Sequence, residues 1–72
     1  MKIEYDPVHD LLNLEFLPEV EIEESVEIDG VILDYAKDRR IVAIEILDAG
    51  KRTTQDPLHL IDVAIVRQAA GK

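Results

Sequence analysis

Two carboxylates, Asp34 and Glu45, have the residue type and spacing that could do chemistry. They fall in two alternating apolar segments that a short polar turn joins. Counting about the centre of that turn sets Asp34 opposite Ala43 and Glu45 opposite Ile32, so the carboxylates should be diagonal neighbours on one sheet face. Such a pair could share a cation or a water in a small enzyme or metal binder, but it specifies no reaction. An acidic, solvated sheet face is the simpler interpretation, and we favour it.

A second polar group surrounds His9, which Asp6 and Asp10 flank in a predicted loop. A carboxylate can orient a histidine as a general base, yet no serine, cysteine or lysine nucleophile accompanies this one. A turn histidine with local hydrogen bonds is the better interpretation, and His59 is expected to be a surface residue. The chain has no glycine-rich phosphate loop, dinucleotide fingerprint or metalloprotease motif. We therefore predict no catalytic residue, no metal site and no cofactor.

An acidic run accompanies one predicted strand and comprises Glu19, Glu21, Glu23, Glu24, Glu27 and Asp29. Charges of one sign can guard a sheet edge against unwanted pairing, and this is the structural interpretation. The functional interpretation is a docking surface for a basic protein, since complementary charge speeds encounter. Its expected residues are Glu21, Glu23, Glu24 and Glu27.

Composition restricts the classes of function. The 72 residues suffice for one domain, and the formal net charge of -8 disfavours direct binding to nucleic acid or to an anionic membrane. No apolar run is long enough to cross a bilayer, so a soluble cytoplasmic protein is expected. A core this small often needs a disulfide, a metal or a partner subunit to be stable, and the chain has no cysteine. We therefore expect a homo-oligomer, with a dimer as the first choice.

The apolar pattern predicts an α+β fold, with strands in the first two thirds of the chain. Apolar residues alternate with polar ones, which is the period of a half-buried strand. Asp29-Gly30 between two such segments predicts a tight hairpin. The expected architecture is an antiparallel β-meander of four to five strands over residues 1–48, with segments near 1–5, 11–16, 22–28, 31–36 and 41–47.

One C-terminal helix is predicted over residues 57–70, after a polar loop at 49–56. Asp56 suits its N-cap and Pro57 its first position. One apolar arc, which would pack on a sheet face, comprises Leu58, Ile61, Ala64, Ile65 and Ala69. A second apolar set would remain for self-association and comprises Leu60, Val63, Val66 and Ala70.

Several strings together resemble the YuzE-like family of small uncharacterised prokaryotic domains. They are Tyr5-Asp6-Pro7, Asp10 with Leu12, Gly30-Val31-Ile32-Leu33-Asp34-Tyr35 and Ile44-Glu45-Ile46-Leu47-Asp48-Ala49. The resemblance implies a small antiparallel β-domain and brings no established activity. The chain departs from the pattern at Arg39, where a glycine usually closes the turn, and at Ala43, where glycine is frequent. Members look like accessory proteins encoded beside small RNase-like toxins.

The leading hypothesis is a non-enzymatic interaction domain that associates with itself. It depends on the small core, the absence of disulfides and of a predicted metal site, and the second apolar set of the predicted helix. The alternative within the binding class is an acidic partner that neutralises a small basic RNase-like toxin. A small enzyme or metal binder that uses Asp34 and Glu45 is the alternative from another class.

Overall fold

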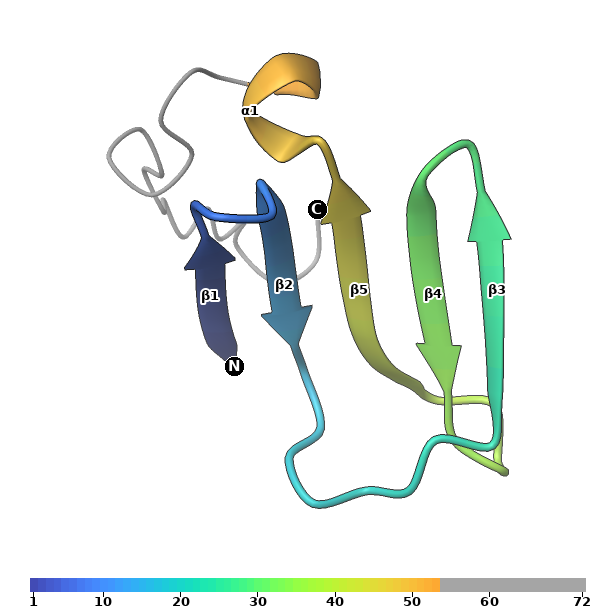
Figure 1. Ribbon diagram of the computed structural model, residues 1–72. Helices are drawn as coiled ribbons and strands as arrows, with labels where there is room; N and C mark the ends of the chain where they lie inside the picture. Colours follow the sequence, from blue (N-terminus) through green and yellow to red (C-terminus); the bar gives the residue numbers. More distant parts are fainter. Residues whose placement is uncertain (54–72) are drawn as a thin grey trace, which may run out of the picture.

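The computed structural model describes residues 1–53, which form five strands and one turn of helix (Figure 1). The elements are β1 (Lys2–Asp6), β2 (Leu11–Glu15), β3 (Glu24–Ile28), β4 (Val31–Tyr35), β5 (Ile41–Leu47) and α1 (Ala49–Arg52). All the strand pairs are antiparallel, so the predicted antiparallel sheet is confirmed. The helix predicted over residues 57–70 lies outside the described residues. Within residues 1–53 no helix is long and apolar enough to cross a membrane.

The strand order is β1-β2-β5-β4-β3, which differs from the meander that we predicted. In a meander each strand pairs with the next, whereas here the last strand lies between β2 and β4. The linker of residues 16–23 carries the chain from β2 to the far edge of the sheet (Figure 1). β5 is apolar on most of both faces, and the central position removes more of that surface from water than an edge would.

Several turns contain residues with left-handed backbone conformations, and the β3–β4 and β4–β5 turns are two of them. Asp29 and Gly30 have φ values of 51° and 78°, as a two-residue hairpin of type I′ requires, so the Asp-Gly hairpin is confirmed. Arg39 has φ of 73°, at the position where the family pattern usually has glycine. Its guanidinium carbon lies 4.4 Å from the centroid of the Tyr35 ring, and Nη1 lies 2.6 Å from Glu24 Oε1. These contacts offset the strain that a side chain brings to this conformation.

The register divides the side chains of the sheet between two faces. We call one the apolar face; it carries Ile3, Tyr5, Leu12, Leu14, Val26, Ile28, Val31, Leu33, Ile44 and Ile46. The other, the polar face, carries Lys2, Glu4, Asn13, Glu15, Ser25, Glu27, Asp34 and Glu45 among smaller and apolar residues. Segregation of this kind is what an antiparallel sheet with one covered side needs.

The buried core of the described residues is small. Its buried apolar side chains are Leu12, Ala36, Val42, Ala43 and Ala49. Ala36, Val42 and Ala43 form a cluster against which the linker residues Leu17 and Val20 pack. Most of the apolar face is only half-buried. The sheet is one layer, and an apolar sheet face becomes stable by packing on a second layer.

Helix α1 lies in the segment 49–56, where we predicted a polar loop. Ala49 is buried, and its N–H donates to the carbonyl oxygen of Asp10 at 3.0 Å. Asp48 enters the helix with φ of 53° and caps no N–H with its side chain. The turn was missed because Gly50 disfavours helix and Asp48 gives no capping signal. A contact with the β1–β2 turn holds it instead.

Candidate functional site

The carboxylates of Asp34 and Glu45 lie on adjacent strands in the predicted register. Asp34 pairs with Ala43 and Glu45 pairs with Ile32, so the diagonal arrangement is confirmed. Asp34 is only 6% exposed, and its Oδ1 accepts a hydrogen bond from the Ser25 hydroxyl at 2.6 Å. Within residues 1–53 no group of three or more His, Cys, Asp or Glu side chains is arranged to hold a metal. The geometry gives Asp34 a structural partner in Ser25 rather than a reacting group.

Glu45 also belongs to a row of hydrogen-bond acceptors across the polar face. Glu4 pairs with Asn13 across β1 and β2, and Asn13 pairs with Glu45 across β2 and β5. They border a depression of about 350 Å³, and Asn13 Oδ1 is buried there with no hydrogen-bond partner. An ionised carboxylate only accepts hydrogen bonds, so neither flanking glutamate can satisfy this oxygen while charged. Sequence reasoning did not single out Asn13, because nothing in its neighbourhood marks it.

His9 lies in the β1–β2 turn and contacts Asp6. His9 Nδ1 is 2.7 Å from Asp6 Oδ2, and the histidine side chain is 75% exposed. Asp6 Oδ1 accepts hydrogen bonds from the backbone N–H groups of Val8 at 2.9 Å and His9 at 3.4 Å. The hydrogen bond from the His9 ring, with those backbone donors, holds the pKa of Asp6 below its usual value. This is the predicted turn histidine with local hydrogen bonds.

The Asp10 carboxylate joins the β1–β2 turn to α1. Its Oδ1 accepts hydrogen bonds from the Tyr5 hydroxyl at 2.6 Å and from the Gly50 N–H at 2.8 Å. These donors, the Tyr5 hydroxyl foremost, lower the pKa of Asp10. The role was missed because Gly50 is distant in sequence. The signal that could have found it is that Tyr5, Asp10 and Ala49 all belong to the strings that carry the family resemblance.

The acidic run forms a surface along the β3 edge and the linker that leads to it. Glu24 and Glu27 lie on β3, and Glu21 and Glu23 lie in the linker. Two of the acidic residues of the run have ion pairs: Glu24 with Arg39 at 2.6 Å, and Asp29 with Arg52 at 3.2 Å. No ion pair within residues 1–53 engages the other four, which are Glu19, Glu21, Glu23 and Glu27. The surface therefore carries uncompensated negative charge.

The profile of a protein family of unknown function, DUF2283, matches residues 2–49 of the chain. The match runs from β1 to the first residue of α1. The chain belongs to the DUF2283 family. The predicted membership of a family of small uncharacterised domains is thus confirmed, whereas the name YuzE-like is not. No curated protein and no solved structure matches the chain.

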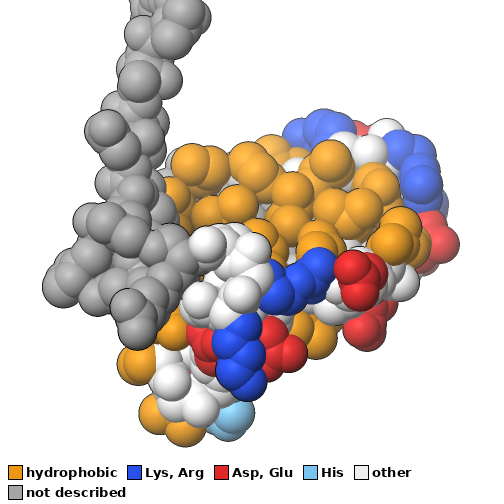
Figure 2. Space-filling model, turned by 90° about the horizontal axis from the view of Figure 1, so that it is seen from above, with side chains coloured by type: hydrophobic (Ala, Val, Ile, Leu, Met, Phe, Trp, Pro, Cys, Tyr) orange, Lys and Arg blue, Asp and Glu red, His pale blue; other side chains and the backbone are white. Residues whose placement is uncertain are grey.

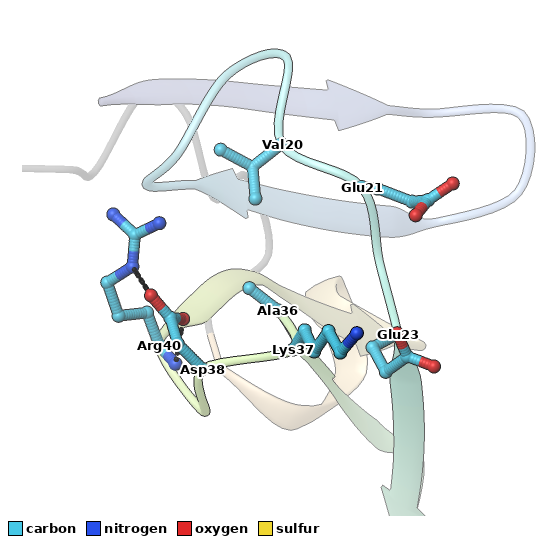
Figure 3. A pocket seen from close by; sticks show the side chains of 7 residues that line it. All are labelled: Val20, Glu21, Glu23, Ala36, Lys37, Asp38 and Arg40. Atoms are coloured by element: carbon cyan, nitrogen blue, oxygen red, sulfur yellow. Dashed lines mark hydrogen bonds and ion pairs between the residues drawn. The ribbon is translucent and has the colours of Figure 1, made fainter.

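A depression adjoins the acidic surface of this DUF2283 domain (Figure 3). Its volume is about 490 Å³, and it lies between the linker and the β4–β5 turn. Val20 and Ala36 supply apolar lining, while Arg40 Nε donates to Asp38 Oδ2 at 2.7 Å beside it. The other lining residues are Glu21, Glu23 and Lys37. An apolar floor with a charged rim suits a protein side chain better than a reacting substrate.

The apolar face of the DUF2283 domain has no covering element among the described residues. Figure 2 shows apolar side chains gathered in one broad area over the sheet and bordered by charged ones. Ile28 on this face is 63% exposed. The self-association residues that we predicted, Leu60, Val63, Val66 and Ala70, lie outside the described residues. Within residues 1–53 the apolar face is therefore a surface that still lacks a second layer.

Proposed function

We propose that this DUF2283 chain is a non-enzymatic, cytoplasmic interaction domain that associates with copies of itself. The observation that carries the proposal is the single-layer sheet with one apolar face. Burial of apolar surface drives association at about 25 cal/mol per Å², and soluble monomers seldom leave broad apolar patches open. The second layer that such a face needs has to come from outside residues 1–53.

The polar groups support a binding role over catalysis. Asp34 is satisfied by Ser25, His9 is paired with Asp6 in an exposed turn, and Asp10 is occupied by Tyr5 and Gly50. A general base or nucleophile has to face a space that substrate can enter. These side chains hold turns and strands together instead.

Sedimentation equilibrium of the full chain tests the proposal. We expect the weight-average mass to rise from that of one chain to that of a dimer or larger assembly with increasing concentration. A strictly monomeric species at high micromolar concentration would contradict the proposal.

A second candidate function is the neutralisation of a small basic protein such as an RNase-like toxin. The uncompensated charge of Glu19, Glu21, Glu23 and Glu27 favours it, together with the adjoining depression lined by Val20 and Ala36. A basic partner would gain both opposite charge and an apolar contact at this surface.

Affinity capture from the source cell tests this second candidate with a matched pair of variants. One variant replaces Glu21, Glu23 and Glu27 with glutamine, and the control replaces Glu4, Glu15 and Glu45. Both remove the same charge. We expect a basic protein on the wild type and the control, and its loss from the first variant and at high salt. Equal capture by both variants would contradict docking at the β3 edge.

A further inference from the structure

Among residues 1–53 the sheet has two edges, β1 and β3, and each is a regular strand. Neither contains proline, and neither pairs with its neighbour through a bulge. An edge strand leaves a row of backbone N–H and C=O groups available to another strand. A second copy of the chain could therefore extend the sheet at one edge, and the side-chain charges decide which.

At β1 the polar face carries one cation, Lys2, followed by two acidic residues, Glu4 and Asp6. Lys2 and Glu4 lie there two positions apart, with their side chains 60% and 59% exposed. Residues that face each other in an antiparallel pair lie on the same side of the sheet. A two-fold axis at Ile3 then sets Lys2 opposite the partner's Glu4 and Glu4 opposite the partner's Lys2.

The other symmetric registers of β1 are less favourable. An axis at Lys2 or at Glu4 brings that residue against its own copy, so like charges meet. The axis at Glu4 would also oppose Lys2 to the partner's Asp6, but it keeps a like-charge pair at the axis, whereas the axis at Ile3 has none. An axis at Tyr5 sets Glu4 against the partner's Asp6, which are both acidic.

The same register matches the apolar face. Ile3 meets the partner's Ile3, and Met1 meets the partner's Tyr5. Met1 is 75% exposed, so pairing with an aromatic ring would remove much of that surface from water. The apolar faces of the two sheets would then form one continuous surface across the axis.

The β3 edge cannot pair with itself in this way. Its sequence, Glu-Ser-Val-Glu-Ile, contains no cation, so no register gives an opposite-charge pair between two copies. Self-pairing would also bring two acidic surfaces together.

We infer that two copies of the chain join through β1, antiparallel, with Ile3 on the two-fold axis and reciprocal Lys2–Glu4 pairs. This inference rests on the proposed self-association and names its surface and register. The two edges thus have different roles: β1 pairs with a second copy, and the acidic β3 edge disfavours such pairing.

Charge reversal tests the register. In Lys2→Glu and in Glu4→Lys, like charges face each other at both reciprocal pairs, and we expect the dimer dissociation constant to rise by about tenfold or more. An equimolar mixture of the two variants restores opposite charges and should dimerise like the wild type. The double variant Lys2→Glu/Glu4→Lys should do the same. Glu27→Lys on the β3 edge is the matched control and should leave the dissociation constant unchanged.

A cysteine scan supplies a second measurement. The chain has no cysteine, so Ile3→Cys introduces one thiol per copy. At the axis the two Cα atoms lie about 4.5–5.5 Å apart, within the range that a disulfide spans. We expect mild oxidation to cross-link Ile3→Cys quantitatively and to leave the control Val26→Cys monomeric on a denaturing gel.

The outcomes separate the inference from the proposed function. The β1 register would be overturned if the wild type dimerises but charge reversal neither weakens the dimer nor makes the two variants complement each other. Self-association would then still stand. A wild type that stays monomeric at all concentrations would overturn both. Circular dichroism of each variant checks folding, and the surface ion pairs of Lys2 contribute too little for their loss to unfold the sheet.

Discussion

The two hairpins that flank β5 are of similar length, but polar contacts hold them at different places. The β3–β4 hairpin is held near its open end, where the Ser25 hydroxyl on one strand donates to the buried Asp34 carboxylate on the other. The β1–β2 hairpin is held at its turn, where Asp10 binds Tyr5 and the backbone of α1. Within residues 1–53, the hydrogen bonds and the ion pair between the turn of the β3–β4 hairpin and α1 join Arg52 to the exposed Asp29. Helix α1 therefore depends chiefly on one hairpin.

The difference predicts the largest effect for the contact near the open end of β3–β4. Ser25→Ala leaves the buried Asp34 carboxylate without this donor, and we expect a loss of about 1–3 kcal/mol in the free energy of unfolding. Urea denaturation measures it. Ser25→Thr keeps a hydroxyl on a strand position and serves as the control. Equal stability of the alanine and threonine variants would show that the hydrogen bond contributes little.

Asp10→Ala should produce the next largest loss, because it removes the acceptor of both the Tyr5 hydroxyl and the Gly50 N–H. We expect a lower urea midpoint and faster amide exchange at Gly50. The comparison variant is Asp29→Ala at the other turn. Its φ of 51° is close to the 52° of Asp10, so both variants have a similar left-handed backbone cost, and the midpoint of Asp29→Ala should move less. Similar urea midpoints for the two variants would contradict the claim that α1 depends chiefly on the β1–β2 turn.

Gly30→Ala probes the turn of the other hairpin. Gly30 has φ of 78°, and a Cβ there would lie 2.8 Å from Arg52 Nη1. The left-handed conformation costs alanine about 1–2 kcal/mol, whereas the arginine end can move aside. Thermal unfolding measures the loss, and Arg52→Ala/Gly30→Ala should show the same loss relative to Arg52→Ala. A much smaller loss in that background would assign the cost to the arginine contact.

Arg52→Ala should have a small effect on the free energy of unfolding. The guanidinium donates to the carbonyl oxygen of Asp29 and lies 3.2 Å from Asp29 Oδ2, and that carboxylate side chain is 90% exposed. Exposed pairs of this kind contribute about 0–1 kcal/mol. Chemical denaturation at low and high salt measures it. If Arg52→Ala lost as much free energy of unfolding as Asp10→Ala, the contacts of the two turns with α1 would be equivalent.

Acid should weaken the β1–β2 turn selectively. The pKa of Asp10 is held below its ordinary value of 3.8 in the folded chain, so the unfolded chain takes up the proton first. Its stabilisation is complete above the ordinary pKa and is lost as pH falls through the lowered one. Asp10→Asn should flatten the dependence of stability on pH in that window. An unchanged slope would show that other carboxylates, such as Asp6 and Asp38, dominate.

Local features of the sequence predicted most of the strands. Alternation located all five, Asp29-Gly30 located a hairpin, and the count about the 37–40 turn gave the register of Asp34 and Ala43. Each signal involves residues that are close in sequence. The acidic run was also placed correctly beside an edge strand.

The parts that were missed depend on contacts between distant residues. The central position of β5 follows from pairing with both β2 and β4, and alternation within one strand cannot choose between neighbours. Helix α1 and the role of Asp10 require the β1–β2 turn and residues 49–50 to meet. The same limitation hid the apolar face, because its extent becomes visible only when five strands are aligned.

The central position of β5 has a consequence for synthesis on the ribosome. Both hairpins emerge before the strand that joins them, and an isolated two-stranded hairpin is marginally stable in water. β3–β4 can extend to β5 through a short turn, whereas β2 must wait for a partner encoded about thirty residues later. The five described strands therefore form one sheet only after β5 leaves the exit tunnel, and until then the nascent chain exposes apolar strands that chaperones recognise.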